Sequence, residues 1–258
     1  MRVHHLNCGT MRLPGARVVT HVLLLETPTG LALVDTGYGV ADIAAPARRL
    51  GAYRHVVRPV LDRAETAVEQ VRGLGFAPED VRDVVVTHFD TDHVGGLADF
   101  PWARVHVTAT EWEAASRPRT ALERARYRSA QWEHGPQIAA HGPGGESWRG
   151  FAAARELTDV APGVVLVPLP GHTRGHAAVA VDAGSRWVLH AGDAFYDLRA
   201  LTGGVKPPAA LRAQERAVAH DRGSLRANQE RLAELHRQGQ QDLLLVNAHD
   251  PAPLAAAR

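Results

Sequence analysis

The 258-residue chain has little cysteine and few aromatic side chains, and it has no long hydrophobic run. Its single cysteine, Cys8, cannot form an internal disulfide, which excludes a disulfide framework and favours a reducing compartment. The longest apolar runs, such as residues 22–25 and 243–246, are far too short to cross a bilayer. The N-terminus also has no apolar core of signal-peptide length. These absences predict a soluble, cytoplasmic protein that does not associate with a membrane.

The chain also lacks an excess of charge of either sign. Lysine and arginine together number 29 and acidic residues 28, so the net charge is +1, which argues against a nucleic-acid binder that uses a strong basic field. Hydrophobic residues make up 45% of the chain, so it can bury a core and is not disordered. Histidine is the abundant functional residue, at 15.

The order of expected elements indicates an α/β protein. Short β-rich runs alternate with helical patterns in the order strands, helices, strands, helices and one last strand, which two facing sheets with helices outside would satisfy. We expect strands at 18–26, 31–35, 84–87, 104–108, 164–169, 177–182, 187–190 and 243–247. We expect helices at 41–50, 64–74, 111–132 with a break near Pro118, 207–219 and 224–238, and a loop at 134–150.

Four metal-binding side chains fall within six residues, directly after one of the expected strands. They are His88, Asp90, Asp92 and His93, and Gly95 and Gly96 follow them. A tight loop can direct several of these side chains at one or two cations, because imidazole nitrogens and carboxylate oxygens are the usual ligands of such ions.

Three further candidate ligands also follow expected strands. His172 comes after the strand at 164–169, Asp193 after the strand at 187–190, and His249 after the last strand. Metal sites are commonly assembled from loops at one edge of a rigid sheet. A lone histidine is more often a core or loop residue, but the ordered set favours a metal centre.

This ordered set resembles the metallo-β-lactamase superfamily, whose metal loop usually reads His-x-His-x-Asp-His. The segment 34–37, Val-Asp-Thr-Gly, also resembles that family's early Asp-Thr-Gly turn, and Asp35 is expected to orient the metal loop rather than to bind metal. The resemblance implies an αββα sandwich, with two facing mixed sheets and helices outside. It further implies a single domain over residues 1–258, in which residues 100–160 form an inserted helical and loop segment that walls the site.

The resemblance also implies a site for two divalent metal ions. One ion would take His88, Asp90 and His172, and the other would take Asp92, Asp193 and His249, with His93 completing the second set. Asp193 would bridge the two ions, and a hydroxide between them would be the nucleophile.

Asp90 departs from the family pattern, which has histidine at that place. Three carboxylates and one hydroxide carry four negative charges, which cancel two divalent cations and predict a less electrophilic site than the usual one. Oxygen ligands also favour harder ions, so manganese or iron becomes an alternative to zinc. Asp90 either binds metal directly or supports the ligands from outside the coordination sphere.

Tyr196 narrows the expected substrate. It follows Asp193 by three residues, which is similar to the N-acyl-homoserine lactonase group, where a tyrosine after the bridging aspartate faces the substrate carbonyl. Its phenol could stabilise an oxyanion, and the alternative is a tyrosine that packs at a turn. Five arginines at 117, 119, 124, 126 and 128 are expected to form a solvated helix face, with steering of an anionic substrate as the alternative.

Together these features predict a metal-dependent hydrolase that opens an ester-like bond in a small molecule, with a lactone as the expected substrate. Asp92 and Tyr196 are the expected catalytic residues, and a homodimer is left open. Thioester or phosphodiester hydrolysis and mononuclear-iron sulfur dioxygenation are alternatives on the same fold. A ligand-binding protein with a degenerate metal site is the alternative outside catalysis.

Overall fold

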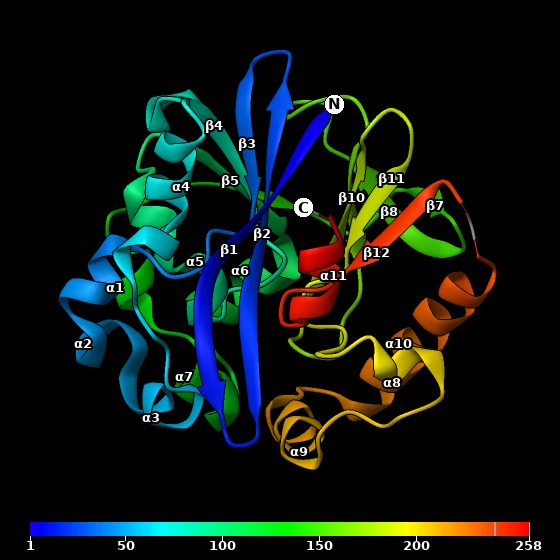
Figure 1. The fold of residues 1–258 in the computed structure, drawn as a ribbon. Coiled ribbons are helices and arrows are strands. Elements are labelled where there is room, and N and C mark those ends of the chain that lie inside the picture. The colour runs from blue at the N-terminus through cyan, green and yellow to red at the C-terminus, as the bar shows by residue number, and fades with distance from the viewer. Residues whose placement is uncertain (240, 258) are drawn as a thin grey trace.

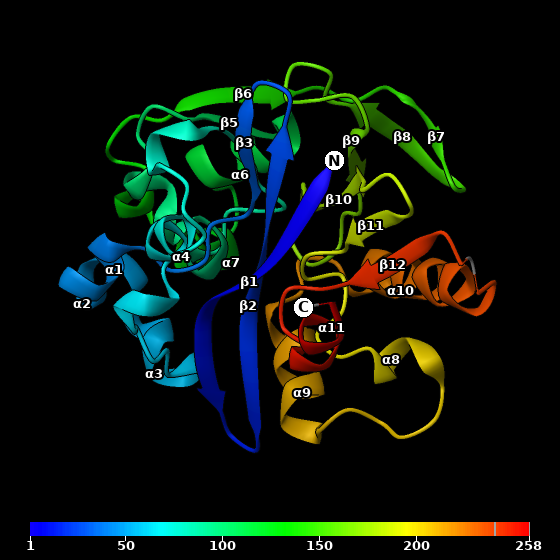
Figure 2. The same ribbon diagram turned by 45° about the horizontal axis from the view of Figure 1, so that its top comes forward.

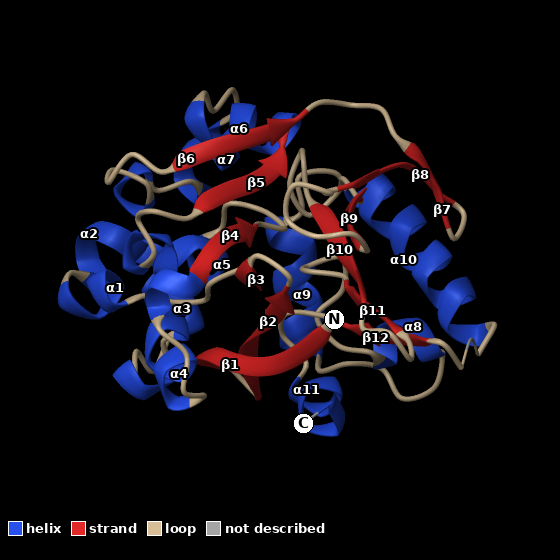
Figure 3. Ribbon diagram, turned by 90° about the horizontal axis from the view of Figure 1, so that it is seen from above, coloured by secondary structure: helices blue, strands red, loops and turns tan. Residues whose placement is uncertain are grey.

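Two six-stranded sheets face each other in the computed structural model, and helices cover the outer face of each sheet (Figure 1 and Figure 3). The structure describes residues 1–239 and 241–257. This is the αββα sandwich that the sequence predicts. Both sheets mix parallel and antiparallel neighbours.

The first sheet has the strand order β1-β2-β3-β4-β5-β6. Its first three strands are antiparallel neighbours, and the next three join in parallel through helical crossovers. The bounds are β1 Arg2–Leu13, β2 Ala16–Thr27, β3 Gly30–Val34, β4 Val81–Val85, β5 Arg104–Thr108 and β6 Gln137–His141.

The second sheet has the order β12-β11-β10-β9-β8-β7. Its neighbours are antiparallel except for β11 and β12, which run parallel because helices intervene between them. The bounds are β7 Glu146–Trp148, β8 Phe151–Glu156, β9 Val164–Pro168, β10 Ala177–Asp182, β11 Trp187–His190 and β12 Leu243–Val246.

Helices α1 to α7 lie on the side of the first sheet, and α8 and α10 lie outside the second (Figure 2 and Figure 3). The α-helices are α1 Val40–Ala44, α2 Pro46–Leu50, α3 Arg54–Val57, α4 Ala67–Gly73, α5 Thr91–Val94, α6 Ala109–Ser116, α7 Ala121–Arg126, α8 Arg199–Thr202, α9 Ala209–Val218, α10 Arg222–Arg237 and α11 Pro251–Ala257. Short 3-10 turns are η1 Gly51–Tyr53, η2 Arg63–Glu65, η3 Pro78–Asp80, η4 Gly95–Asp99 and η5 Ser129–Gln131.

The apolar run in β2 explains how one strand serves two cores. Leu23 and Leu25 pack between the sheets, whereas Val22 and Leu24 pack toward the helices on the outer face. Successive side chains of a strand point to opposite faces, so a continuous apolar run marks a strand that is buried on both sides. The sheets are therefore fixed rigidly, and the loops at their edges have a stable base.

Several elements differ from the sequence prediction. The expectation of an inserted helical and loop segment at 100–160 is wrong in part, because this segment supplies β5 and β6 to one sheet and β7 and β8 to the other. The first strand, β1, is missing from the prediction because His4, His5, Asn7 and Thr10 interrupt its apolar pattern. Strand β8 is Ala- and Arg-rich, a composition with low strand preference, and it forms by pairing with β9.

Among the described residues, none of the helices combines the length and the apolar character that crossing a bilayer requires.

Candidate metal centre

The predicted ligands come together at one edge of the sandwich, where strands of both sheets end. His88 follows β4, and Asp92 and His93 lie in the single turn of α5. From the other sheet, His172 follows β9, Asp193 follows β11 and His249 follows β12. Residues that are more than 150 positions apart in the sequence thus share one site because rigid strands deliver them to the same edge.

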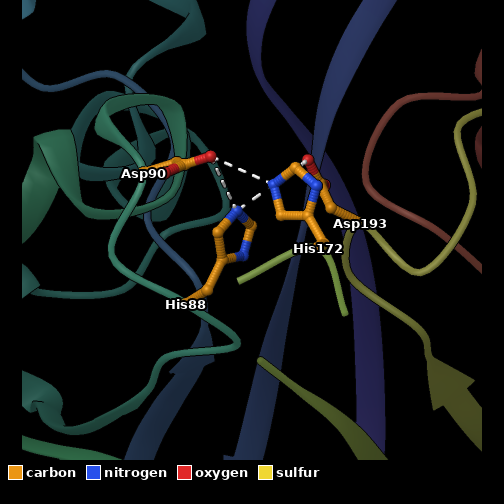
Figure 4. Close-up of side chains that lie close together, drawn as sticks. All are labelled: His88, Asp90, His172 and Asp193. Carbon is orange, nitrogen blue, oxygen red and sulfur yellow. Dashed lines mark hydrogen bonds and ion pairs between the residues drawn. The ribbon is translucent and has the colours of Figure 1, made fainter. Parts of the chain in front are cut away.

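The first group contains His88, Asp90, His172 and Asp193, whose side chains point toward one another (Figure 4). The Asp90 Oδ2 atom lies 3.4 Å from His88 Nε2 and 3.1 Å from His172 Nε2. Asp193 Oδ2 lies 3.3 Å from the same His172 nitrogen. One ligand atom from each residue falls within 4.8 Å of all the others. The group can therefore surround a single cation.

The second group contains Asp92, His93 and His249. The Asp92 Oδ2 atom lies 3.7 Å from His93 Nε2 and 3.6 Å from His249 Nε2. Asp193 also contacts this group, because its Oδ1 lies 3.3 Å from His93 Nε2 and its Oδ2 lies 3.1 Å from His249 Nε2. Asp193 therefore has the position expected of a carboxylate that bridges two cations.

Hydrogen bonds on the far side of the rings direct three histidines into the centre. Nδ1 of His93 donates to Asp35, and Nδ1 of His249 donates to the Val19 carbonyl, each at 2.9 Å. Nδ1 of His88 lies 3.0 Å from the Thr87 hydroxyl, which is itself bonded to Asp35. This arrangement leaves Nε2 of each ring with a lone pair aimed at the cluster, as metal-binding histidines require.

The cluster contains buried polar atoms that make no hydrogen bond within the described chain. Nε2 of His88, Nε2 of His93 and Oδ1 of Asp193 are buried without a hydrogen bond. Buried polar atoms are normally paired, and an ion is one of the explanations for an exception. Imidazole nitrogen and carboxylate oxygen are also the donors that zinc and similar ions take. The residues present therefore fit a pair of divalent cations.

The electrostatics of the cluster also favour cations. Burial would lower the pKa of His249, but the negative charge of Asp193 raises it to about 9. Burial would raise the pKa of Asp90, but the positive charge of Arg126 and the neighbouring imidazoles hold it well below its usual value. Nearby positive charge likewise holds the pKa of Asp193 well below its usual value, so the carboxylates of Asp90 and Asp193 stay ionised and attract positive charge into the site.

Asp35 supports the metal loop from behind, as the sequence predicts. Its carboxylate accepts from the backbone N–H of Thr87 at 2.7 Å, from the Thr87 hydroxyl at 2.8 Å and from His93. The residue is fully buried and has a φ of 60°, a left-handed conformation that is uncommon for a side chain other than glycine. The surrounding bonds stabilise this conformation and fix the direction of His93.

Glu111 joins the two ligand loops, a role that no local sequence pattern indicates. Its carboxylate is buried. Oε1 accepts a hydrogen bond from the Phe89 N–H at 2.9 Å, and Oε2 accepts from the Thr173 hydroxyl at 2.7 Å and from the Gly175 N–H at 3.1 Å. Phe89 stands between His88 and Asp90, and Thr173 follows His172. One carboxylate on α6 therefore holds loops from both sheets in register.

His176 is a buried histidine beside the cluster that belongs to neither ligand group. It is fully buried, donates through Nδ1 to the Leu169 carbonyl and accepts through Nε2 from the Asp193 N–H at 2.9 Å. Gly192 makes this contact close, because a Cβ there would lie 2.6 Å from His176 Nε2. His176 therefore positions the backbone of Asp193.

Tyr196 lies beside the cluster at the wall of a small cavity. Its ring centroid is 4.8 Å from that of His249, and the same cavity is lined by Asp92 and Asp193. An adjoining cavity of about 130 Å³ has apolar walls that include Leu50 and Leu122 and reaches Asp90 and Asp92. The ligand cluster thus opens onto space that a small, partly apolar molecule can occupy.

Comparison with known proteins agrees with the fold. The family model of the metallo-beta-lactamase superfamily matches residues 15–237. The chain belongs to this superfamily. It is 55% identical over its whole length to the probable metallo-hydrolase Rv2300c of Mycobacterium tuberculosis and covers 83% of that protein.

Two lactonases are also similar to this member of the superfamily. The N-acyl homoserine lactonase AttM of Agrobacterium fabrum is 31% identical over 117 residues, which are 45% of this chain and 44% of AttM. A solved structure of a mutant of AiiA from Bacillus thuringiensis, with N-decanoyl-L-homoserine bound at the active site, aligns with a TM-score of 0.75 and 20% identity, covering 100% of this chain and 96% of that one. The chain is thus a metal-dependent hydrolase of this superfamily.

Removing one residue of the cluster should remove bound metal. We expect His172→Ala and Asp193→Ala to lower the metal content measured by elemental analysis, because each deletes a donor that no nearby side chain replaces. The exposed His236 on α10 offers a control, and His236→Ala should keep the full metal content. Full metal content in the His172 or Asp193 variant would contradict the assignment.

Glu111→Gln tests the bond between the loops. The amide places an NH₂ group where two or more N–H or O–H donors now point, so we expect metal affinity to fall by about tenfold or more. Metal affinity can be measured by competition with a chromophoric chelator. Glu113→Gln is the matched control, because Glu113 lies on the same helix and is exposed. Equal affinities in the two variants would show that Glu111 has no positioning role.

Proposed function

We propose that this hydrolase opens lactones, and that the seven clustered residues hold two divalent metal ions, with zinc as the expected metal. The observation that carries the proposal is the position of Tyr196 beside a cluster that opens onto an apolar-walled cavity. The similarity to AttM and to AiiA supports a lactone in particular. Manganese or iron is the alternative metal because Asp90 adds a third carboxylate.

His88, Asp90 and His172 would hold one ion, and Asp92, His93 and His249 the other, with Asp193 shared. When bound, the two cations would polarise the substrate carbonyl and make a water molecule more acidic. Hydrolysis adds the oxygen of water to the carbonyl carbon and breaks the ring C–O bond. The proton that water gives up passes to the leaving oxygen, and we assign its transfer to the Asp92 carboxylate.

Tyr196 would stabilise the oxygen that gains negative charge. Its side chain is buried beside His249 and faces the cavity that Asp92 and Asp193 also line. A phenol O–H in a buried site donates a strong hydrogen bond to a developing oxyanion, and the donor is already in place before the reaction. Two flanking apolar side chains, Leu50 and Leu122, would contact the non-reacting part of the substrate.

A substrate panel tests the lactone assignment. We expect the zinc-loaded protein to hydrolyse a medium-chain N-acyl homoserine lactone with a higher kcat/KM than a matched linear ester, a thioester or a phosphodiester. Removal of metal with a chelator should abolish the activity, and added zinc should restore it. Preference for the thioester or the phosphodiester would replace the lactone with that substrate. Binding of a ligand without turnover of any of them would indicate a protein that is not catalytic.

Tyr196→Phe separates catalysis from metal binding. Loss of the hydroxyl should lower kcat toward the lactone by about 100-fold, as for the loss of one oxyanion donor, while the metal content stays unchanged. Tyr38→Phe is a suitable control, because Tyr38 is also buried and its hydroxyl is bonded to Met11. An unchanged kcat in the Tyr196 variant would remove the proposed role of the phenol.

A further inference from the structure

Arg126, at the end of α7, does not lie on a solvated helix face as the sequence predicts. Its side chain is only 7% exposed, whereas Arg124 on the same helix is exposed. Burying a guanidinium is costly unless it is paired and hydrogen-bonded. The contacts of Arg126 therefore indicate what this charge does.

All three guanidinium nitrogen atoms of Arg126 contact other groups of the protein, and two of these groups belong to predicted ligands, Asp90 and His172. Nε lies 3.4 Å from Asp90 Oδ1. Nη1 donates to the main-chain carbonyl of His172 at 2.8 Å, and Nη2 donates to the carbonyl of Val218. The guanidinium thus contacts groups of the protein itself, and Arg126 also lines the cavity of about 130 Å³ beside Asp90.

Asp90 divides its two oxygen atoms between Arg126 and the cluster. Oδ1 faces Arg126, while Oδ2 faces His88 and His172. The carboxylate brings one negative charge to a place where the superfamily motif usually has a neutral imidazole, and the guanidinium brings one positive charge directly behind it. The pair together is neutral, as the imidazole would be.

We propose that Asp90 and Arg126 form one unit that takes the place of the second histidine of the metal motif. Asp90 supplies the ligand atom, and Arg126 holds that carboxylate in place and cancels its charge toward the cations. The sequence-based expectation of a less electrophilic site follows from Asp90 alone, and the buried guanidinium offsets it. This inference rests on the proposed metal centre but not on the lactone as substrate.

The pair can be tested by exchanging Asp90 alone and then both members together. Zinc affinity is measured by competition with a chromophoric chelator for the unaltered protein, Asp90→His, and the double variant Asp90→His with Arg126→Met. Asp90→His alone leaves an unpaired positive charge beside the cations, so we expect zinc affinity to fall by about tenfold or more. Adding Arg126→Met removes that charge, and affinity should return to near that of the unaltered protein.

Further variants separate charge from structure. Asp90→His with Arg126→Lys keeps the positive charge and should stay as weak as Asp90→His alone. Arg126→Gln replaces Arg126→Met if the methionine variant does not fold, because its amide can still donate to a carbonyl. The control Arg124→Met should leave zinc affinity unchanged, both in the otherwise unaltered protein and in the Asp90→His variant.

The outcomes distinguish this inference from the proposed metal centre. If the unaltered protein binds zinc and the double variant binds it more weakly than Asp90→His alone, Arg126 only braces the loops and the inference fails. Unchanged affinity in Asp90→His would also overturn it. If the unaltered protein binds no divalent ion, the metal centre fails, and this inference fails with it.

Discussion

The site depends on the cost of holding buried carboxylates close together. A carboxylate oxygen of Asp90 lies within 4.8 Å of one of Asp193, and Asp92 contacts His249, as Asp193 does. Like charges at such separations repel strongly in a buried site, so the arrangement is stable only with compensating positive charge and with rigid support. Divalent cations would supply the charge from within the cluster, and Arg126 supplies it from behind.

The fold provides the rigid support through a few buried side chains that join loops from different strands. Asp35 ties the end of β3 to Thr87 and His93, and Glu111 ties the loop that contains Phe89 to the one that contains Thr173. These bonds bridge segments of both sheets, so the geometry of the centre depends on how the sheets pack against each other. The apolar layers on both faces of β2 hold that packing in place.

Local sequence predicted the parts of this arrangement that local chemistry determines. The ligands could be found because they follow short apolar strands in an ordered pattern, and the strand of β2 because its apolar run is continuous. Glu111, Arg126 and His176 could not be assigned, since their roles come from contacts with residues distant in the sequence. The segment around Arg126 carries other arginines, at 117, 119 and 124, that are exposed, and nothing in the sequence separates the buried one from them. Likewise, β1 and β8 have polar or alanine-rich sequences and form through pairing with their neighbours.

Elemental analysis of the unaltered protein, purified without chelators and dialysed against metal-free buffer, tests the central claim most directly. The account predicts two divalent ions per chain, because two ligand groups share Asp193. A content of one ion or none, under conditions in which the protein remains folded, would contradict it.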